Sequence, residues 1–256
     1  MRVIITGAAR GIGEATALLL AERGDSVILV DRTPGVQDRA REIAERSGND
    51  QLVTVVGDVT DERTALEACD VGTAHFGGVD GLVNNAAIGG DSSLAIDTDV
   101  AQFRRILDVN LVGYFVFAKT VANHLRRAGR RGAIVNIGSM FGQRGNARSV
   151  AYCAAKGGVA LMSQVFALEL AQDGIRVNNV APGNIGTEMH WQTLTEKAEI
   201  EGTTLELEVA KQAAEVPMGR LGRPREIAEA VAWLLGEGSS YVTGQTIAVN
   251  GGVYLS

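Results

Sequence analysis

Tyr152 and Lys156 lie four residues apart in a stretch rich in alanine, glycine, leucine and valine, which predicts a helix. This spacing places both side chains on one helical face. An ammonium beside a phenol favours the phenolate, so the lysine is expected to lower the pKa of Tyr152. Such a tyrosine can exchange a proton with an alcohol near neutral pH. Ser139 follows the apolar run 133–137, and its hydroxyl could bind the oxygen of the same reacting carbon.

A tyrosine and a lysine on one helical face are more often a half-buried ring beside a lysine stem. A second motif favours chemistry instead. The apolar run 3–5 is followed by a glycine-rich loop at 6–13 and by a helical pattern up to Gly24. This order of strand, glycine loop and helix is the context of a dinucleotide-binding fingerprint, in which the helix N-terminus binds the pyrophosphate. The residues expected to contact the cofactor here are Gly7, Arg10, Gly11, Ile12 and Gly13.

The second expected strand, 26–31, ends in Asp31, about 20 residues beyond the glycine loop, where the fingerprint requires an acid. A carboxylate at this place accepts hydrogen bonds from the ribose hydroxyls and repels a 2′-phosphate. Asp31 therefore favours NAD over NADP. Arg10 and Arg32 favour NADP, although we interpret Arg32 as a solvated side chain or one that lies over the adenine.

Other candidate residues follow the third and fourth strands. Asp58 could accept a hydrogen bond from the adenine amino group, with Val59 covering the ring. Small residues after the fourth strand would let the backbone pass close to a flat cofactor; they belong to the run Asn85, Ala86 and Ala87. Asn110 lies inside a long, otherwise apolar helical pattern at 100–128. A buried amide needs partners, so Asn110 is expected to disturb the helical hydrogen bonds and to hold a water.

Composition excludes several classes of function. The net charge of −6 argues against nucleic acid as a partner, because phosphate binding requires a basic surface. Cys69 and Cys153 lack metal-ligand spacing, so we expect a reducing compartment and no metal site. Neither a leader peptide nor an apolar run of about 20 residues is visible. We therefore expect a cytoplasmic protein with no membrane partner.

The alternation of strands and helices predicts an α/β fold of the Rossmann-like, doubly wound type. We expect a seven-stranded parallel sheet with helices on both faces, in a single domain that spans 1–256. After the sixth strand, the helical pattern at 188–216 is charged and interrupted. Because substrates bind beyond the carboxyl ends of the strands, this segment is predicted to be a mobile lid over the substrate. The alternative is a peripheral pair of surface helices.

Together these motifs resemble the short-chain dehydrogenase/reductase family, in its compact form of about the length of this chain. The matching stretches are 6–13, 58–59, 84–87, Asn110, Ser139, 152–156 and 182–187. The resemblance implies that Tyr152 is the acid/base and that Lys156 lowers its pKa and binds the nicotinamide ribose. It also implies that Ser139 holds the substrate oxygen and that Asn110 positions a water in a proton relay behind Lys156. Ile185 and Thr187 are implied to hold the nicotinamide carboxamide, and Pro182 and Gly183 are further expected cofactor-binding residues.

Three positions depart from the family pattern. Gly138 stands where many members have a second serine, Ala87 where glycine is usual, and Asn250 where aspartate is frequent. The first two are expected to affect the floor of the site. The resemblance also implies a homotetramer or homodimer, assembled through the helices at 100–128 and 150–172.

The predicted activity is hydride transfer between NAD(H) and a secondary alcohol or ketone. Polar residues among the candidate walls favour a sugar or polyol over a steroid. These walls comprise Ser139, Met140, Gln143, Arg144, Asn146, Asn184, His190, Trp191 and the loop 88–90. The enzymatic alternative is an NADPH-dependent 3-oxoacyl thioester reductase, which the arginine cluster near 126–131 weakly favours. The alternative from another class is a non-catalytic protein that senses NAD(H).

Overall fold

The computed structural model describes residues 1–90 and 92–255. These residues form a seven-stranded parallel sheet in the order β3-β2-β1-β4-β5-β6-β7. The strands are β1 (Arg2–Thr6), β2 (Ser26–Asp31), β3 (Leu52–Val56), β4 (Gly81–Asn84), β5 (Gly132–Ile137), β6 (Ile175–Pro182) and β7 (Thr246–Val249). The predicted Rossmann-like, doubly wound fold is confirmed.

Strand order reverses between β1 and β4, which pair side by side although two strands separate them in sequence. Parallel strands bring their carboxyl ends to one edge of the sheet. In an open α/β sheet, the crevice at such a reversal point is where ligands bind. The glycine loop follows β1 and the 85–90 segment follows β4, so both border this crevice.

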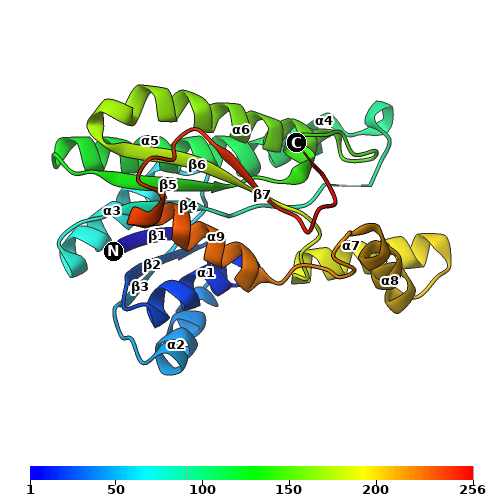
Figure 1. Ribbon diagram of the computed structural model, residues 1–256, viewed down its shortest axis with the longest axis horizontal. Helices are drawn as coiled ribbons and strands as arrows, with labels where there is room; N and C mark the ends of the chain where they lie inside the picture. The colour runs from blue at the N-terminus through cyan, green and yellow to red at the C-terminus, as the bar shows by residue number, and fades with distance from the viewer. Residues whose placement is uncertain (91, 256) are drawn as a thin grey trace.

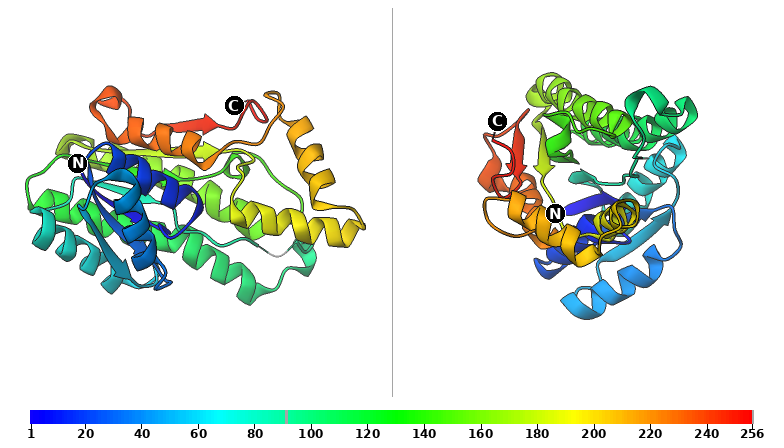
Figure 2. Two further views of the ribbon diagram at one scale, coloured as in Figure 1. Left: turned by 90° about the horizontal axis from the view of Figure 1, so that it is seen from below. Right: turned by 90° about the vertical axis from the view of Figure 1, so that its right-hand side faces the viewer.

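Helices cover both faces of the sheet, as Figures 1 and 2 show. The helices are α1 (Gly11–Glu22), α2 (Val36–Ser47), α3 (Glu62–Phe76), α4 (Val100–Leu107), α5 (Gly113–Arg127), α6 (Val150–Leu170), α7 (Glu188–Glu201), α8 (Leu205–Glu215) and α9 (Pro224–Leu235). One face is covered by α1, α2 and α9, and the other by α3, α5 and α6.

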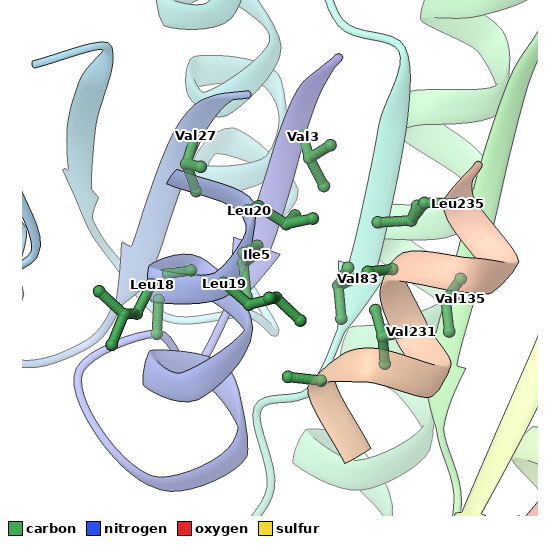
Figure 3. Close-up of a cluster of buried hydrophobic side chains, with 14 of the residues drawn as sticks. Val3, Ile5, Leu18, Leu19, Leu20, Val27, Val83, Val135, Val231 and Leu235 are labelled. Carbon is green, nitrogen blue, oxygen red and sulfur yellow. The ribbon is translucent and has the colours of Figure 1, made fainter. Parts of the chain in front are cut away.

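Each face of the sheet has its own apolar core, because successive side chains of a strand point to opposite faces. Val3 and Ile5 pack with Leu19 of α1 and Val231 of α9 (Figure 3), whereas Ile4 packs in the second cluster under α3 and α5. Strands that are buried on both faces read as continuous apolar runs. This double burial explains the unbroken hydrophobic runs in the sequence.

The single helix expected at 100–128 is interrupted. A π-helical turn at Asp108–Val112 separates α4 from α5, and Asn110 lies inside it. The expected disturbance of the helical hydrogen bonds around Asn110 is therefore confirmed. Such one-turn π segments occur frequently at functional sites.

One helical stretch, 150–173, has the length and apolar composition of a helix that could cross a membrane. The core helix of a soluble protein passes the same test. This stretch packs against β6 and carries Lys156, which lines the cavity described below. In the described residues, this is the one helix that meets the test, and it does so by length and composition only.

The 188–216 segment forms α7 and α8, which project beyond the carboxyl edge of the sheet (Figures 1 and 2). A fully buried carboxylate joins them. Glu208 of α8 accepts hydrogen bonds from Lys211 at 2.6 Å and Thr203 at 2.9 Å, and it pairs with Lys197 of α7 at 2.9 Å. These contacts make the two helices one packed unit.

We expect Glu208→Gln to speed amide hydrogen exchange in α7 and α8 but not in α6. Hydrogen bonds from Lys197 and Lys211 hold the pKa of Glu208 at about 2. A lowered folded-state pKa means that the carboxylate stabilises the helix pair above its unfolded pKa near 4.5, and that this stabilisation is lost as pH falls towards 2. Exchange measured at pH 7 checks the prediction, with the exposed Glu199→Gln as control. Equal protection in the two variants would contradict it.

Candidate active site

A cavity of about 1150 Å³ opens at the carboxyl edge of the sheet, beneath α7. Its walls come from the loops that follow β1, β2, β3, β4, β5 and β6. Asp31, at the end of β2, and His190 of α7 both line it. Its position at the strand-order reversal is that of a ligand site in this class of fold.

The glycine loop forms one wall. Gly7, Arg10, Gly11 and Ile12 line the cavity, as predicted. Gly13 does not line the cavity, and its contact with the cofactor stays a prediction. A Cβ at Gly13 would lie 2.2 Å from the Gly7 carbonyl oxygen, so this glycine lets α1 pack closely on the loop. The outcome is a strand-to-helix turn whose backbone is accessible to a ligand at the start of α1.

Asp31 is held at the rim of the same wall. One carboxylate oxygen accepts from the Ala9 N–H at 3.2 Å, and the other accepts from the N–H and hydroxyl of Thr33 at 3.0 and 2.9 Å. Arg10 forms an ion pair with Glu188 of α7 at 2.9 Å, which connects the glycine loop to the projecting helices. The Arg10 charge is thus partly neutralised by Glu188, while Asp31 faces the cavity.

The remaining predicted cofactor residues all line the cavity; they are Arg32, Asp58, Val59, Asn85, Ala86, Ala87, Pro182, Gly183, Ile185 and Thr187. Asn85 donates to the carbonyls of Thr6 and Gly7 at 3.0 Å each and so fixes the glycine loop. At Gly7, φ is +65° and a Cβ would lie 2.7 Å from the Ala86 Cα, so only glycine fits. These groups fit a dinucleotide, with backbone N–H groups for phosphate and a carboxylate for ribose.

Ser139, Tyr152 and Lys156 line the same cavity. Ser139 lies two residues after β5, and its Oγ accepts from the Phe141 N–H at 3.1 Å. A hydrogen bond with Ser139 also acts on the Tyr152 hydroxyl. The two hydroxyls are therefore neighbours, as a site that binds one substrate oxygen between them requires.

Comparison with known proteins agrees with this geometry. Residues 7–254 match the family model described as enoyl-(acyl carrier protein) reductase. The chain is 41% identical to cis-4-hydroxycyclohexanecarboxylate dehydrogenase of Sinomonas cyclohexanicum, over 97% of this chain and 94% of that protein. It is 40% identical to the 3-oxoacyl-[acyl-carrier-protein] reductase FabG of Vibrio cholerae, over 98% and 96%.

The chain belongs to the short-chain dehydrogenase/reductase family. It is an oxidoreductase that acts on CH–OH groups. Glucose 1-dehydrogenase 2 of Bacillus subtilis is 35% identical, over 98% of this chain and 94% of that protein. Among solved structures, levodione reductase superposes with a TM-score of 0.92 at 32% identity, covering 98% of this chain and 96% of that one. Actinorhodin polyketide ketoreductase with NADPH superposes with a TM-score of 0.93 at 31% identity, covering 98% of this chain and 96% of that one.

The expected lowering of the Tyr152 pKa is not found in this dehydrogenase/reductase structure. Burial raises the pKa of Tyr152, more strongly than the hydrogen bond with Ser139 lowers it. Lys156 is also buried, which lowers its pKa to about 7. Its Nζ lies 5.8 Å from the centre of the Tyr152 ring and donates to the Ile137 carbonyl at 2.7 Å and the Tyr114 hydroxyl at 3.0 Å. Burial opposes both charged forms, so the i,i+4 spacing alone does not produce a phenolate.

Asn110 is fully buried, and both polar atoms of its side-chain amide form hydrogen bonds with the backbone of Ile88. Its Nδ2 donates to the Ile88 carbonyl and its Oδ1 accepts from the Ile88 N–H, each at 2.9 Å. Asn110 therefore holds the loop after β4, and its relay role stays a prediction. The sequence analysis missed Tyr114, whose hydroxyl contacts Lys156. Tyr114 could have been found from its position four residues after Asn110, because residues at this spacing lie on the same face of a helix.

The candidate substrate residues divide into two groups. Ser139, Met140, Asn184 and His190 line the cavity, and so do Arg144, Asn146 and the loop 88–90. Gln143 and Trp191 do not line the cavity, so the structure does not bring them together with the other candidates, and their contact with substrate stays a prediction. The Trp191 ring packs against Gly186, where a Cβ would lie 2.9 Å from it. Consecutive residues point in different directions, which a sequence window cannot resolve.

Two departures from the family pattern have local explanations. A Cβ at Gly138 would lie 2.5 Å from Asn179 Oδ1, so a serine there would displace the Asn179 amide. Asn250 closes the turn after β7, since its Oδ1 accepts from the Gly252 N–H at 3.0 Å and its Nδ2 donates to the Tyr254 carbonyl at 2.7 Å. Within residues 1–90 and 92–255, no cluster of His, Cys, Asp or Glu could hold a metal ion.

Proposed function

We propose that this enzyme oxidises a secondary alcohol of a small, polar, hydroxylated molecule, such as a sugar or polyol, with NAD, and reduces the ketone in reverse. One observation carries the proposal: the hydroxyls of Ser139 and Tyr152 border the same cavity as the Asp31 carboxylate. A dinucleotide that contacts Asp31 and the glycine loop would extend towards these hydroxyls. NAD supplies the hydride acceptor when it is bound.

The residues of this chain would handle the proton. The alcohol oxygen lies between Ser139 and Tyr152, and the Ser139 hydroxyl donates a hydrogen bond to it. The Tyr152 phenolate accepts the alcohol proton as the carbonyl forms. The Lys156 ammonium behind it would stabilise that phenolate, and Asn110 would hold the neighbouring loop.

The choice of NAD rests on Asp31. Its carboxylate faces the cavity, and Arg10, which could bind a 2′-phosphate, is paired with Glu188. The competing choice is NADP, because Arg32 also lines the cavity and actinorhodin polyketide ketoreductase is described with NADPH. In this proposal, the repulsion between the Asp31 carboxylate and a 2′-phosphate outweighs the attraction of that phosphate to Arg32.

Relatives named for ring alcohols support the substrate class. They include the dehydrogenases of cis-4-hydroxycyclohexanecarboxylate, glucose and L-fucose. The cavity walls include the polar side chains of Asn184, His190, Arg144 and Arg148. The Arg144 guanidinium lies over the rings of Phe141 and Tyr254, at 5.7 and 5.6 Å, and forms no ion pair within the described residues. Arg144 could pair with an acidic group on a hydroxylated ring, so the proposal includes such substrates.

The second candidate is an NADPH-dependent 3-oxoacyl thioester reductase. Its support is the 40% identity to FabG of Vibrio cholerae. The arginine cluster favours it less than expected, because Arg126 pairs with Asp173 at 2.8 Å and Arg130 with Asp80 at 3.7 Å. A third candidate, a non-catalytic sensor of NAD(H), would require an inactive Tyr152 site.

Assembly, lid and location complete the proposal. Apolar side chains are exposed on α5 and α6, with Leu161 65% and Leu168 82% exposed, which suits a homodimer or homotetramer packed through these helices. The α7–α8 unit would act as the substrate lid, since His190, Lys197 and Gln212 line the cavity. A cytoplasmic location is proposed for the enzyme, and nucleic acid and membranes are not proposed as partners.

The deciding experiment is a turnover screen in which each alcohol is tested with NAD and with NADP. The panel contains 4-hydroxycyclohexanecarboxylate and its methyl ester, glucose and glucuronate, a polyol and a 3-hydroxyacyl thioester. We expect NAD-linked oxidation of the ring alcohols, with each acid preferred to its neutral partner. Strongest activity on the thioester with NADP would establish the second candidate instead. Tight NADH binding without any turnover would indicate the sensor.

We expect Asp31→Ser to lower kcat/KM for NAD by about 30-fold and to leave that for NADP equal or higher. A hydrogen bond to a charged group contributes about 1.5–3 kcal/mol, or roughly 10- to 100-fold. Steady-state kinetics with both cofactors measure the ratio. Asp38→Ser, on the exposed side of α2, is the control. An unchanged NAD/NADP ratio would remove Asp31 from the ribose site.

A further inference from the structure

Tyr114 lies in the first turn of α5, directly after the π-helical turn that contains Asn110. Its side chain is 1% exposed and its hydroxyl is enclosed by the protein. The hydroxyl donates to the Ile137 carbonyl, two residues before Ser139, at 3.1 Å. A buried phenol with such a bond is ordinarily a packing residue. A second contact makes this one different.

The second contact is with Lys156, whose side chain is also 1% exposed. Lys156 Nζ donates to the Tyr114 hydroxyl at 3.0 Å and to the Ile137 carbonyl at 2.7 Å, and it lies 4.5 Å from the centre of the Tyr114 ring. The three groups form a closed triangle. An ammonium has three N–H donors, so this triangle uses two and leaves one for a partner on the cavity side.

Among the described residues, no charged side chain pairs with this buried ammonium. Tyr114 faces it from α5, the Ile137 carbonyl from β5 and Tyr152 from α6 itself. Lys156 forms no ion pair within residues 1–90 and 92–255, and desolvation is the cause of its altered pKa. A buried charge needs hydrogen-bond acceptors in place of water. Here the Tyr114 hydroxyl is the side-chain acceptor, and the Ile137 carbonyl is the backbone one.

We propose that Tyr114 is a positioning residue, whose hydroxyl orients the Lys156 ammonium behind Tyr152 and stabilises its charged form. The proposal deepens the proposed function and rests on it, because Tyr114 acts on the reaction through Lys156. Its hydroxyl hydrogen is committed to Ile137, so a lone pair points to Nζ. A hydrogen bond from an ammonium is stronger than one from a neutral amine, so this acceptor favours the cation.

Removal of the hydroxyl leaves one ammonium hydrogen buried without an acceptor. Proton binding by Lys156 should then weaken by about tenfold, which lowers its titration midpoint by about one pH unit. With less positive charge beside it, Tyr152 should lose its proton at higher pH. The two changes have opposite signs, which distinguishes them from a general loosening of the site.

The direct test is a pH titration of Lys156 by NMR, in protein labelled with [ε-13C]lysine and without cofactor. The chain has four lysines, and Lys119, Lys197 and Lys211 are each more than 40% exposed. Lys156→Met identifies the fourth signal by its loss. In the wild type, this signal should titrate near pH 7, where burial places the Lys156 pKa. In Tyr114→Phe, the midpoint should fall by about one pH unit.

Kinetics supply an independent readout. In Tyr114→Phe, kcat for alcohol oxidation should fall about tenfold at pH 7, and the rising limb of its pH profile should move up by about one pH unit. KM for NAD should stay within about threefold, because the hydroxyl does not face the cofactor. The control is Tyr241→Phe, which removes a hydroxyl from a fully exposed ring. It should change neither the midpoint nor the profile.

An unchanged Lys156 midpoint and an unchanged pH profile, in a Tyr114→Phe protein that only melts at a lower temperature, would show that Tyr114 merely packs. If that variant fails to fold, Tyr114→Met keeps an apolar side chain without the acceptor oxygen and should give the same shift. The NMR titration needs no substrate. Absence of turnover on every alcohol would therefore overturn the proposed function and leave the Tyr114 result to be judged separately.

Discussion

Tyr152→Phe is expected to lower kcat by about a thousandfold, because a phenyl ring cannot accept the alcohol proton, and general acid–base groups contribute about 10²- to 10⁴-fold. NADH should bind within about threefold of the wild type, since the ring is kept. The Tyr152 hydroxyl is the only part of the side chain that changes. It lies beside Ser139 at the cavity wall, so its loss should not alter the packing of α6.

Single-turnover kinetics and a fluorescence titration with NADH measure the two quantities separately. Ser139→Ala should fall between the wild type and Tyr152→Phe, because it removes a hydrogen bond and leaves the proton acceptor in place. Tyr254→Phe, which changes a ring that packs against Arg144 and does not line the cavity, should keep nearly full turnover. If Tyr152→Phe retains turnover within about tenfold of the wild type, another group takes the proton.

Gly13→Ala is expected to destabilise the fold by about 3 kcal/mol and to abolish cofactor binding, because overpacked sites of this kind cost about 1–3 kcal/mol or more. Its Cβ would lie 2.2 Å from the Gly7 carbonyl oxygen, 2.9 Å from the Gly7 carbonyl carbon and 2.6 Å from Asn85 Nδ2. Two of these are backbone atoms of the turn itself. Relief would require α1 to move away from β1, which would also displace the backbone N–H groups.

Urea unfolding and calorimetry with NADH check both parts of this prediction. Gly35→Ala is the matched control, because nothing lies within 4 Å of its Cβ position and its φ is −56°. That variant should stay within about 0.5 kcal/mol of the wild type. A Gly13→Ala protein of native stability would mean that the turn relaxes without cost. NADH binding by such a protein would then exclude Gly13 from any role in the site.

The fold could be predicted because its signals are local. Apolar runs such as 27–30 recur along the chain, and only a parallel sheet covered on both faces buries every one of them. The glycine loop and Asp31 can be assigned to the site because each lies at the carboxyl end of a predicted strand. Both therefore lie at the cavity, as expected.

Some site residues could not be predicted because their directions depend on distant packing. Met140 and Gln143 stand in one short loop, yet only Met140 lines the cavity. The Trp191 ring packs on Gly186, a contact that depends on how α7 leaves β6. A sequence shows which residues are close along the chain, but it does not show the direction in which each side chain points.

By itself, the sequence determined the sheet, the family and the presence of Ser139, Tyr152 and Lys156 at one edge, since strand ends and helical spacing are local properties. Only the tertiary structure decided the state of Lys156. Its ammonium turns to Tyr114 and Ile137, 42 and 19 residues away in the chain, and burial lowers its pKa while it raises that of Tyr152. Desolvation is a sum over all atoms that surround a group, and those atoms come together only when the chain folds.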